Sequence, residues 1–573
     1  MRKLRKRLVT MNKKKQKNED SQAPGKLFQI SYKVFKSPGK ALARRQSSLS
    51  TELLKSNIRV LPEVYASLVV FATVLSVVAI PIALILPLPL LFKLPLFAAP
   101  VIAFLVTFSG PKISQGSRSS SLDKELPYML DYMAILASGG GGNIIENLRK
   151  ISDTSVFKIS SKEIRVILKQ IDIFGKDPVT AIEYAAKYCP NRRFSEFLAG
   201  YANTIKIGGK PDTYILGKLK ETMDEKATKV KQSVEVVGNF AEAYLMLTSL
   251  LGITLFTIFQ TEAFVSHVNG SITSLLMFSY LVVPLVSVAF VWVINGIIGD
   301  NPYVDMRPYK IMRYFIPVAA ILVLPIPIPF FLKMGITLTA ISLVPGLFEM
   351  RYAKFRTQSE TRISDFLNDL AENRKLGMSP EIAIQNLGAS DYGMLSPMIQ
   401  QLGATLSWGV DTKTAFQMFS DKLRTWSAKA LSLLLFNTLE SGGGTEQNLR
   451  LLADFTKTLT TTSASRKSSL RLYIFLVYIS AVVVVIIPFL LAYLTFVPTT
   501  IPNFSTAAST FKVPPGELDQ LFAGTAFEAW VMGIVAGKMG GGSVADGLLH
   551  GAILVIVSVA MVYIVGQFIP LAI

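Results

Sequence analysis

The chain has 573 residues, of which 50% are hydrophobic and only 17% are charged, and its mean hydropathy is +0.43. These values argue against a soluble globular protein and are typical of a polytopic membrane protein with sizeable water-exposed parts. The single cysteine, Cys189, excludes a disulfide framework, and with His267 and His550 as the only histidines we expect no metal site and no cofactor.

The first 60 residues are strongly basic. They hold 17 Lys and Arg residues against three acids, so they carry +14 of the formal net charge of +20. No short apolar core follows the first basic cluster, so we expect no cleaved signal peptide. The chain has no basic motif interleaved with aromatic residues, so we do not expect it to bind nucleic acid. We expect residues 1–60 to form a disordered cytosolic tail that obeys the positive-inside rule, and an added role at an anionic lipid or an acidic partner stays open.

Apolar segments that could form membrane helices, which need about 20 residues each, recur along the rest of the chain. Residues 61–110 hold two, residues 239–349 hold four and residues 472–573 hold three, so the predicted fold class is an all-α polytopic membrane protein. The nine predicted spans are 64–88, 94–110, 239–261, 273–299, 312–332, 334–349, 472–497, 524–537 and 543–570. The second, sixth and eighth are short and contain or adjoin Pro or Gly, so their ends are the hardest to place.

The charges of the connecting segments predict the orientation. With the basic N-terminus inside, the predicted outer loops contain only three Lys or Arg residues, Lys93, Lys333 and Lys512. The two long polar segments, 111–238 and 350–471, contain 20 and 15. Because positive residues favour the cytosolic side, we expect a multi-pass protein of the cell membrane with a cytosolic N-terminus and an outer C-terminus.

The chain has two Asn-x-Ser/Thr sequons, which begin at Asn269 and Asn503. Both fall in predicted outer loops. Because glycosylation takes place on the outer side, the two asparagines are candidate acceptors.

The two polar segments have the hydrophobic periodicity of helical bundles, and we name residues 111–238 module 1 and residues 350–471 module 2. Apolar residues in each recur at i, i+3, i+4 and i+7, without the sustained alternation of strands. Identical residues also recur at a constant offset: Asn203 and Asn437 are 234 positions apart, and two pairs of glycines and one pair of alanines keep this offset. We expect two homologous modules from an internal duplication.

Each module contains three glycine turns. A glycine accepts the left-handed backbone that ends one helix, and an Asp, Ser, Thr or Asn shortly afterwards caps the next, so three turns imply about six helices. The glycines that we expect in these turns are Gly140, Gly175, Gly209, Gly377, Gly409 and Gly443. Phosphate binding is the competing interpretation, but a P-loop needs G-x-x-x-x-G-K-[ST] after a strand, and the chain lacks that string.

Motifs for catalysis are missing. The chain has no H-E-x-x-H, C-x-x-C or G-x-S-x-G string, so we expect no enzyme activity. The acids that approach membrane depth are Glu242, Glu262, Glu528 and Asp546. Asp546 has a structural explanation, because Ser543 can cap the last helix and an acid three residues later suits its first turn. A proton relay between Asp546 and His550, one turn apart, is a weaker alternative.

Two pairs of glycines near the C-terminus have the spacing that lets helices approach closely. They are Gly533 with Gly537, and Gly547 with Gly551. We expect them to pack between helices or between subunits.

Two helical modules with paired glycine turns, alternating with membrane helices, resemble the type II secretion F domain of the platform proteins of type IV pilus-like machines. Nine spans and two long modules most resemble the archaeal version, found in archaellum and adhesion-pilus systems. The stretch Gly537-Lys538 … Gly542 … Gly547-Leu-Leu-His550 is similar to the ending of those archaeal members. The resemblance covers about residues 110–570 and leaves the basic extension 1–60 unmatched.

The resemblance implies a platform in the cytoplasmic membrane beneath a growing filament. A separate hexameric secretion ATPase would engage the modules, and pilin or archaellin subunits would be extracted from the bilayer. The platform itself, a homodimer among membrane lipids, would bind no nucleic acid and hydrolyse no nucleotide. The loop 300–313, with Arg307, Lys310 and Arg313, is then a candidate ATPase-facing surface.

Two alternatives stay open. One is a membrane transporter or channel with regulatory cytosolic domains, although the duplication is clearest in the modules and not in the membrane segments, where a transporter would carry it. The other is an intramembrane protease that uses Asp546.

Overall fold

The computed structural model describes residues 26–46, 48–58, 60–81, 90–138, 144–154, 156–266, 273–298, 306–323, 325–440, 444–500 and 515–568. Throughout these ranges the secondary structure is helical, without a β-strand, and seven of the helices there are long and apolar enough to cross a membrane. The predicted fold class, an all-α polytopic membrane protein, is confirmed. The chain divides into two compact units, unit 1 (Met1–Leu219) and unit 2 (Lys220–Ile573).

Unit 1 begins with three helices inside the segment predicted to be disordered. The helices of this unit are α2 (Lys26–Val34), α3 (Lys36–Arg45), α4 (Leu49–Ser56), α5 (Pro62–Val77), α7 (Leu90–Ser138), α8 (Ile144–Asp153), α9 (Ser160–Asp172), α10 (Pro178–Tyr188), α11 (Arg192–Lys206) and the start of α12 (Pro211–Ser266). Leu49 and Leu53 of α4 are buried in one cluster with Tyr65 of α5. The prediction of disorder is therefore wrong for 26–56, because the apolar residues among the lysines lie on helix faces that pack. Residues 1–25 lie outside the described residues.

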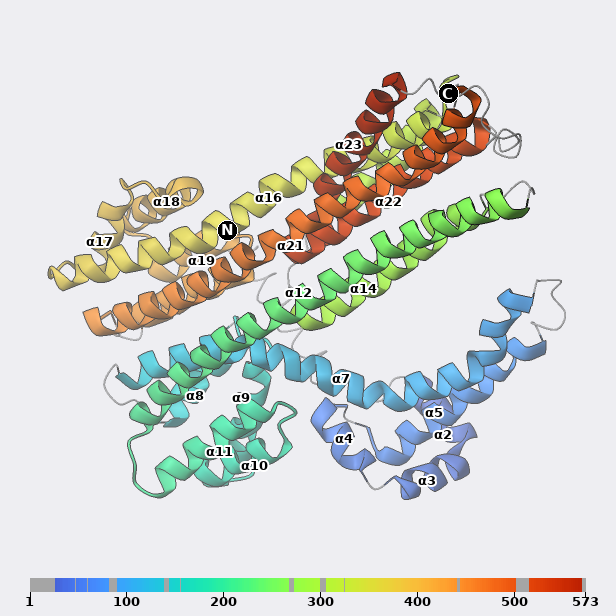
Figure 1. Cartoon of the computed structure of the whole chain (residues 1–573). Helices are drawn as coiled ribbons and strands as arrows, with labels where there is room; N and C mark the ends of the chain where they lie inside the picture. The colour runs from blue at the N-terminus through green and yellow to red at the C-terminus, as the bar shows by residue number, and fades with distance from the viewer. Residues whose placement is uncertain are drawn as a thin grey trace. The chain divides into compact units, whose positions relative to one another are not determined.

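Module 1 has the six helices that its turns predict: the end of α7, then α8 to α11, then the start of α12 (Figure 1).

A buried carboxylate of α7 accepts hydrogen bonds from the start of α9. Glu125 of α7, 7% exposed, accepts hydrogen bonds of 2.7–3.2 Å from the backbone N–H groups of Lys158, Ile159 and Ser160. An anion at a helix N-terminus satisfies donors that have no partner within the helix.

A second carboxylate of α7 is buried without such partners, and it leads to a prediction about pH. Asp131 is 0% exposed, neither of its oxygens has a hydrogen bond among the described residues, and burial raises its pKa well above the ordinary value. The unfolded chain therefore releases this proton near pH 4, while the folded chain retains it to higher pH. The free energy of unfolding falls as pH rises through this window, by about 1.4 kcal/mol per unit of pKa difference.

We expect Asp131→Asn to raise the melting temperature of the detergent-solubilised protein at pH 7, and the gain to disappear near pH 4. The matched control is Asp123→Asn in the same helix. The Asp123 carboxylate accepts a 2.9 Å hydrogen bond from Asn191, so this change should not stabilise the protein. A gain for Asp131→Asn that is equal at both pH values would contradict the explanation.

Unit 2 contains module 2 and the remaining membrane helices. After α12 its elements are α13 (Thr273–Met277), the π-helical turn η1 (Phe278–Val282), α14 (Val283–Ile298), α15 (Arg307–Val323), α16 (Phe330–Lys375), α17 (Pro380–Leu387), the 3-10 turn η2 (Gly393–Leu395), α18 (Ser396–Ser407), α19 (Thr412–Lys422), α20 (Trp426–Glu440), α21 (Glu446–Thr500), α22 (Pro515–Gly541) and α23 (Gly547–Phe568). Figure 1 shows α16, α21 and α22 running side by side over much of their length.

Module 2 also has six helices: the end of α16, then α17 to α20, then the start of α21. Its helices keep the offset seen in the sequence. Helix α10 begins at Pro178 and α19 at Thr412, and α11 begins at Arg192 and α20 at Trp426, so both pairs of starts are 234 residues apart.

Two of the nine predicted spans are not among the seven helices found in the described residues. The second, 94–110, lies inside α7. The fifth, 312–332, has the wrong end, because α15 stops at Val323 and α16 already begins at Phe330. The cause is the segment 325–329, Pro-Ile-Pro-Ile-Pro. Each proline lacks an N–H group and disfavours helical backbone in the residue before it.

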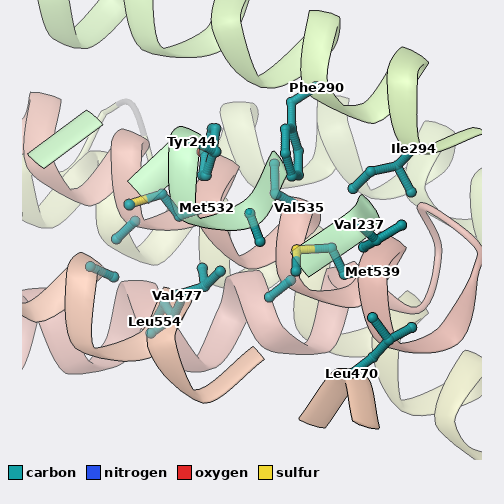
Figure 2. Close-up of a cluster of buried hydrophobic side chains, with 14 of the residues drawn as sticks. Val237, Tyr244, Phe290, Ile294, Leu470, Val477, Met532, Val535, Met539 and Leu554 are labelled. Carbon is teal, nitrogen blue, oxygen red and sulfur yellow. The ribbon is translucent and has the colours of Figure 1, made fainter. Parts of the chain in front are cut away.

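Five membrane helices of unit 2 pack around an apolar core, drawn in Figure 2. Tyr244 of α12 stacks on Phe290 of α14 with ring centroids 4.8 Å apart, and the Tyr244 hydroxyl lies 2.9 Å from that of Ser287. Met532 and Met539 of α22 complete the centre, together with side chains of α21 and α23. The core thus joins five helices, two of which, α12 and α21, continue into the modules.

Candidate coupling site at the α22–α23 turn

The four glycines predicted to pack lie where α22 meets α23 within one chain. A Cβ atom on Gly537 would lie 2.0 Å from the Cα of Gly547, and one on Gly533 would lie 2.4 Å from the Cα of Gly551. Both distances are far below van der Waals contact, so only glycine lets the two backbones come this close. The prediction left packing between helices or between subunits open, and here the contact is between helices.

Ser543 and Asp546 hold the turn that joins these helices, although α23 begins only at the residue after Asp546, so this acid precedes the helix instead of lying in its first turn as predicted. Gly542 adopts a left-handed backbone (φ 85°), and its N–H donates to the carbonyl of Lys538 at 3.1 Å. The Ser543 hydroxyl accepts a hydrogen bond from Ala545 N–H at 3.2 Å. The Asp546 carboxylate accepts one from Ser543 N–H, also at 3.2 Å. These reciprocal bonds resemble a capping box and hold the turn in one shape.

Helix α16 is attached to this turn by a buried ion pair. The Arg356 guanidinium lies 3.5 Å from the Asp546 carboxylate, and both side chains are 10% exposed. Arg356 also donates to the carbonyl of Gly541 at 3.3 Å. A pair so shielded from water is sensitive to the loss of either partner, because the other charge then stays buried and unpaired.

Two further contacts hold the ends of α22 and α23. The Lys538 ammonium donates to Asn295 of α14 at 2.7 Å and to the carbonyl of Gly542 at 2.9 Å. The Tyr478 hydroxyl of α21 lies 2.6 Å from Nδ1 of His550. The turn is thus held from α14, α16 and α21. Asp546 and His550, weighed above as a proton relay, bond to different partners.

Charged residues surround the place where α16 and α21 leave module 2. We name this set the basic collar; it consists of Lys226, Arg356, Arg466, Lys467 and Arg471 with the acids Glu360 and Asp546. The Lys467 ammonium donates to the hydroxyl of Thr357 at 2.8 Å, which bonds α21 to α16. Glu360 lies within electrostatic range of four of the five cations. Five cations against two carboxylates leave the collar positively charged.

The glycines predicted for the module turns are largely where they were expected. Gly175, Gly377 and Gly409 have positive φ angles of 63°, 89° and 72°. In the last turn of module 1 the left-handed residue is Gly208 (φ 72°), and the predicted Gly209 follows it and donates from its N–H to the Thr204 carbonyl at 2.8 Å. That bond is typical of the Schellman motif. Gly140 and Gly443 lie outside the described residues.

The other predicted site residues are spread over the chain. Arg307, Lys310 and Arg313 are exposed in the first turns of α15. The sequon asparagines Asn269 and Asn503 lie outside the described residues. No group of three or more His, Cys, Asp or Glu residues in the described ranges could hold a metal ion.

The acids considered for a membrane protease are not brought together. Glu528 is buried in α22, 13 residues before the last residue of that helix, Gly541. At 1.5 Å per residue this is about 20 Å along the axis from the turn that holds Asp546. Glu242 is exposed, and the side chain of Glu262 is outside those described. An acid dyad needs carboxylates in contact, so these positions do not favour one.

Fold and site together define a polytopic membrane protein in which a helical module continues directly into membrane helices and is bonded to the turn between the last two. Residues 366–493 match the family model of type II secretion system (T2SS), protein F. The match runs from α16 through module 2 into α21, and it confirms the resemblance to this family over these residues. The family is that of the membrane platforms of type II secretion and type IV pilus-like machines.

A relative matches most of the chain. Over 499 residues the chain is 20% identical to an uncharacterized protein, MJ1286, of Methanocaldococcus jannaschii, and the match covers 80% of this chain and 82% of that protein. No solved structure matches the chain.

Proposed function

We propose that this chain is the cytoplasmic-membrane platform of an archaellum or type IV pilus-like filament machine. Modules 1 and 2 lie in the cytosol, where a separate hexameric secretion ATPase engages them. The chain acts as a homodimer in the lipid bilayer and moves pilin or archaellin subunits between membrane and filament. It transmits force and does not hydrolyse nucleotide.

The observation that carries this proposal is the continuity of α16 and α21. They are single helices of 46 and 55 residues, or about 69 Å and 83 Å at 1.5 Å per residue. Both extend from module 2 into the membrane helices of unit 2, where α21 contributes to the apolar core and Phe331 of α16 is buried in a second cluster with Val485 of α21.

A helix has a soft joint only where a proline, a glycine pair or a bulge introduces one. Pro345 lies in the membrane part of α16 and Pro488 in that of α21, whereas residues 347–375 of α16 and 446–487 of α21 contain neither proline nor glycine. A push on module 2 therefore reaches both helices at least as far as the α22–α23 turn.

The coupling site supports the same function. Arg356 of α16 is bonded to the α22–α23 turn, and Lys467 of α21 is bonded to Thr357 of α16. A displacement of the two long helices therefore moves the turn with them. The positive charge of the modules supports a cytosolic location and an N-terminus on the same side.

The candidate ATPase-facing residues lead to a direct test. We expect the combined change of Arg307, Lys310 and Arg313 to Glu to weaken binding of a secretion-type ATPase from the same organism by about tenfold, because reversing exposed charges slows association. Binding would be measured by recovery of the ATPase on the immobilised, detergent-solubilised chain. The control changes three exposed cations that lie outside the family resemblance, Lys33, Arg44 and Arg45, to Glu.

If both triple variants retain the ATPase equally well, α15 is not the contact surface. If the unaltered chain recovers no secretion ATPase, and a small solute instead raises its melting temperature, the platform function is wrong and the transporter alternative gains support.

A further inference from the structure

A cavity of about 270 Å³ lies beside the coupling site, between α16, α21 and the α22–α23 turn. Its polar lining consists of Arg356, Thr357, Lys467, Arg471, Asp546 and His550. Its apolar part includes Met350 and Ile474 among others. The platform function does not require a ligand here, so the cavity and its charges call for a separate explanation.

Along the cavity, the lining residues of α16 and of α21 both change from apolar to basic in the direction of module 2. On α16 the lining runs from Gly346 and Met350 to Arg356, and on α21 it runs from Ile474 back to Arg471 and Lys467. The two helices are adjacent, so the apolar residues share one end of the cavity and the cations share the other. At a bilayer this order is typical of the boundary between acyl chains and headgroups.

The positive charges of the cavity are only partly balanced by protein groups. Arg356 is paired with Asp546. The Lys467 ammonium donates to a neutral hydroxyl, and no hydrogen bond or ion pair of the Arg471 guanidinium occurs among the described residues. Neither Lys467 nor Arg471 forms a salt bridge among the described residues; Glu360 and Asp546 lie within electrostatic range of Lys467, but these two carboxylates are shared among the five cations of the collar. Like charges held this close repel, and a bound anion relieves the repulsion.

Apolar surface continues from the cavity along α21. Leu472, Phe475 and Ile479 are 61%, 62% and 46% exposed, and they follow Arg471 on the part of α21 that is apolar enough to cross a membrane. A ligand with an anionic head and an apolar tail could therefore place its head against the cations and its tail against these apolar side chains. An inorganic anion would use only the charges.

From this arrangement we infer that the cavity binds the phosphate group of an anionic membrane lipid. The phosphate lies between Lys467 and Arg471, and the first carbons of the acyl chains lie against Ile474 and Met350. A guanidinium and an ammonium suit a phosphate well, the former by paired hydrogen bonds and the latter as a point charge. The lipid would join α16 and α21 at the point where module 2 meets the membrane helices.

The test uses the full chain in neutral detergent and follows its melting temperature while a short-chain anionic phospholipid is added. We expect saturable stabilisation by this lipid and much less by a zwitterionic lipid of the same chain length or by inorganic phosphate. Equal stabilisation by inorganic phosphate at the same concentration would overturn the lipid assignment in favour of a free anion. Equal stabilisation by the zwitterionic lipid would overturn the role of the charges.

Variants locate the site. Arg471→Gln removes an exposed charge without a partner, so the chain should fold normally, and we expect the half-saturating lipid concentration to rise about fivefold. Lys467→Gln combined with it should raise that concentration about twenty-five-fold if the effects add. Arg471→Lys should restore most of the affinity. The control is Lys457→Gln, an exposed position of α21 away from the cavity. Unchanged affinity in the double variant would overturn the proposal, whatever the outcome of the ATPase test.

Discussion

Replacing Gly537 by alanine is expected to cost the protein about 3 kcal/mol of stability or more. The new Cβ would lie 2.0 Å from the Cα and 2.1 Å from the N of Gly547. These are backbone atoms, so no side chain can rotate away and the two helices must separate. Inserting a carbon into a well-packed interior typically costs 1–3 kcal/mol, and separation of α22 from α23 would disturb the apolar core as well. A thermal unfolding scan in detergent measures the effect.

The control for this change is Gly516→Ala in the same helix. A Cβ atom at Gly516 would meet no atom within 4 Å, so the variant should be neutral or slightly stabilised by the better helix propensity of alanine. If Gly537→Ala melts at the temperature of the unaltered chain, the backbones of α22 and α23 do not come as close at Gly537 and Gly547 as described.

The second large effect is expected from the ion pair that connects α16 to the α22–α23 turn. Arg356→Met and Asp546→Asn should each lower the free energy of unfolding by about 3 kcal/mol, because each leaves the opposite charge buried without its partner. The double variant should lose much less than the sum of the two, since neither charge then remains unpaired. The three variants form a double-mutant cycle that can be measured by thermal or denaturant unfolding.

An exposed pair in the same helix supplies the control. Arg362 and Asp365 of α16 are 3.0 Å apart with side chains 50% and 46% exposed, and Arg362→Met should change the stability by about 0.5 kcal/mol or less. Equal losses in the free energy of unfolding for Arg356→Met and Arg362→Met would show that the Arg356–Asp546 pair is no more shielded from water than the exposed pair. In cells, we expect the Arg356 and Asp546 single variants, where they still insert, to assemble fewer filaments.

The features that could be predicted from the sequence are those with a local signal. Membrane helices and modules follow from apolar runs and helical periodicity, and the glycine turns follow from chain conformations that only glycine adopts readily. The spacing of Gly533, Gly537, Gly547 and Gly551 predicted a close approach, although it could not show whether the partner was a helix of the same chain.

The coupling site could not be predicted, because its groups are far apart in the chain. Arg356 and Asp546 are separated by 190 positions, and Arg356 stands among other basic residues at the end of a membrane helix, where the positive-inside rule explains it already. The cavity has the same origin in tertiary packing. Residues 26–56 are a different case, because a local signal was present there. Their net charge suggested disorder, although Leu49 and Leu53 have the spacing of a packed helix face.

The continuity of α16 and α21 also restricts how the chain can change in length. One residue inserted into an α-helix turns everything beyond it by about 100° and advances it by 1.5 Å. Module 2 is attached through both helices. An insertion in one helix alone would rotate and shift that helix relative to the other, and this would break the bond between Lys467 and Thr357. Changes in length between module and membrane are therefore tolerable only if they are made in both helices together and come in near-whole turns.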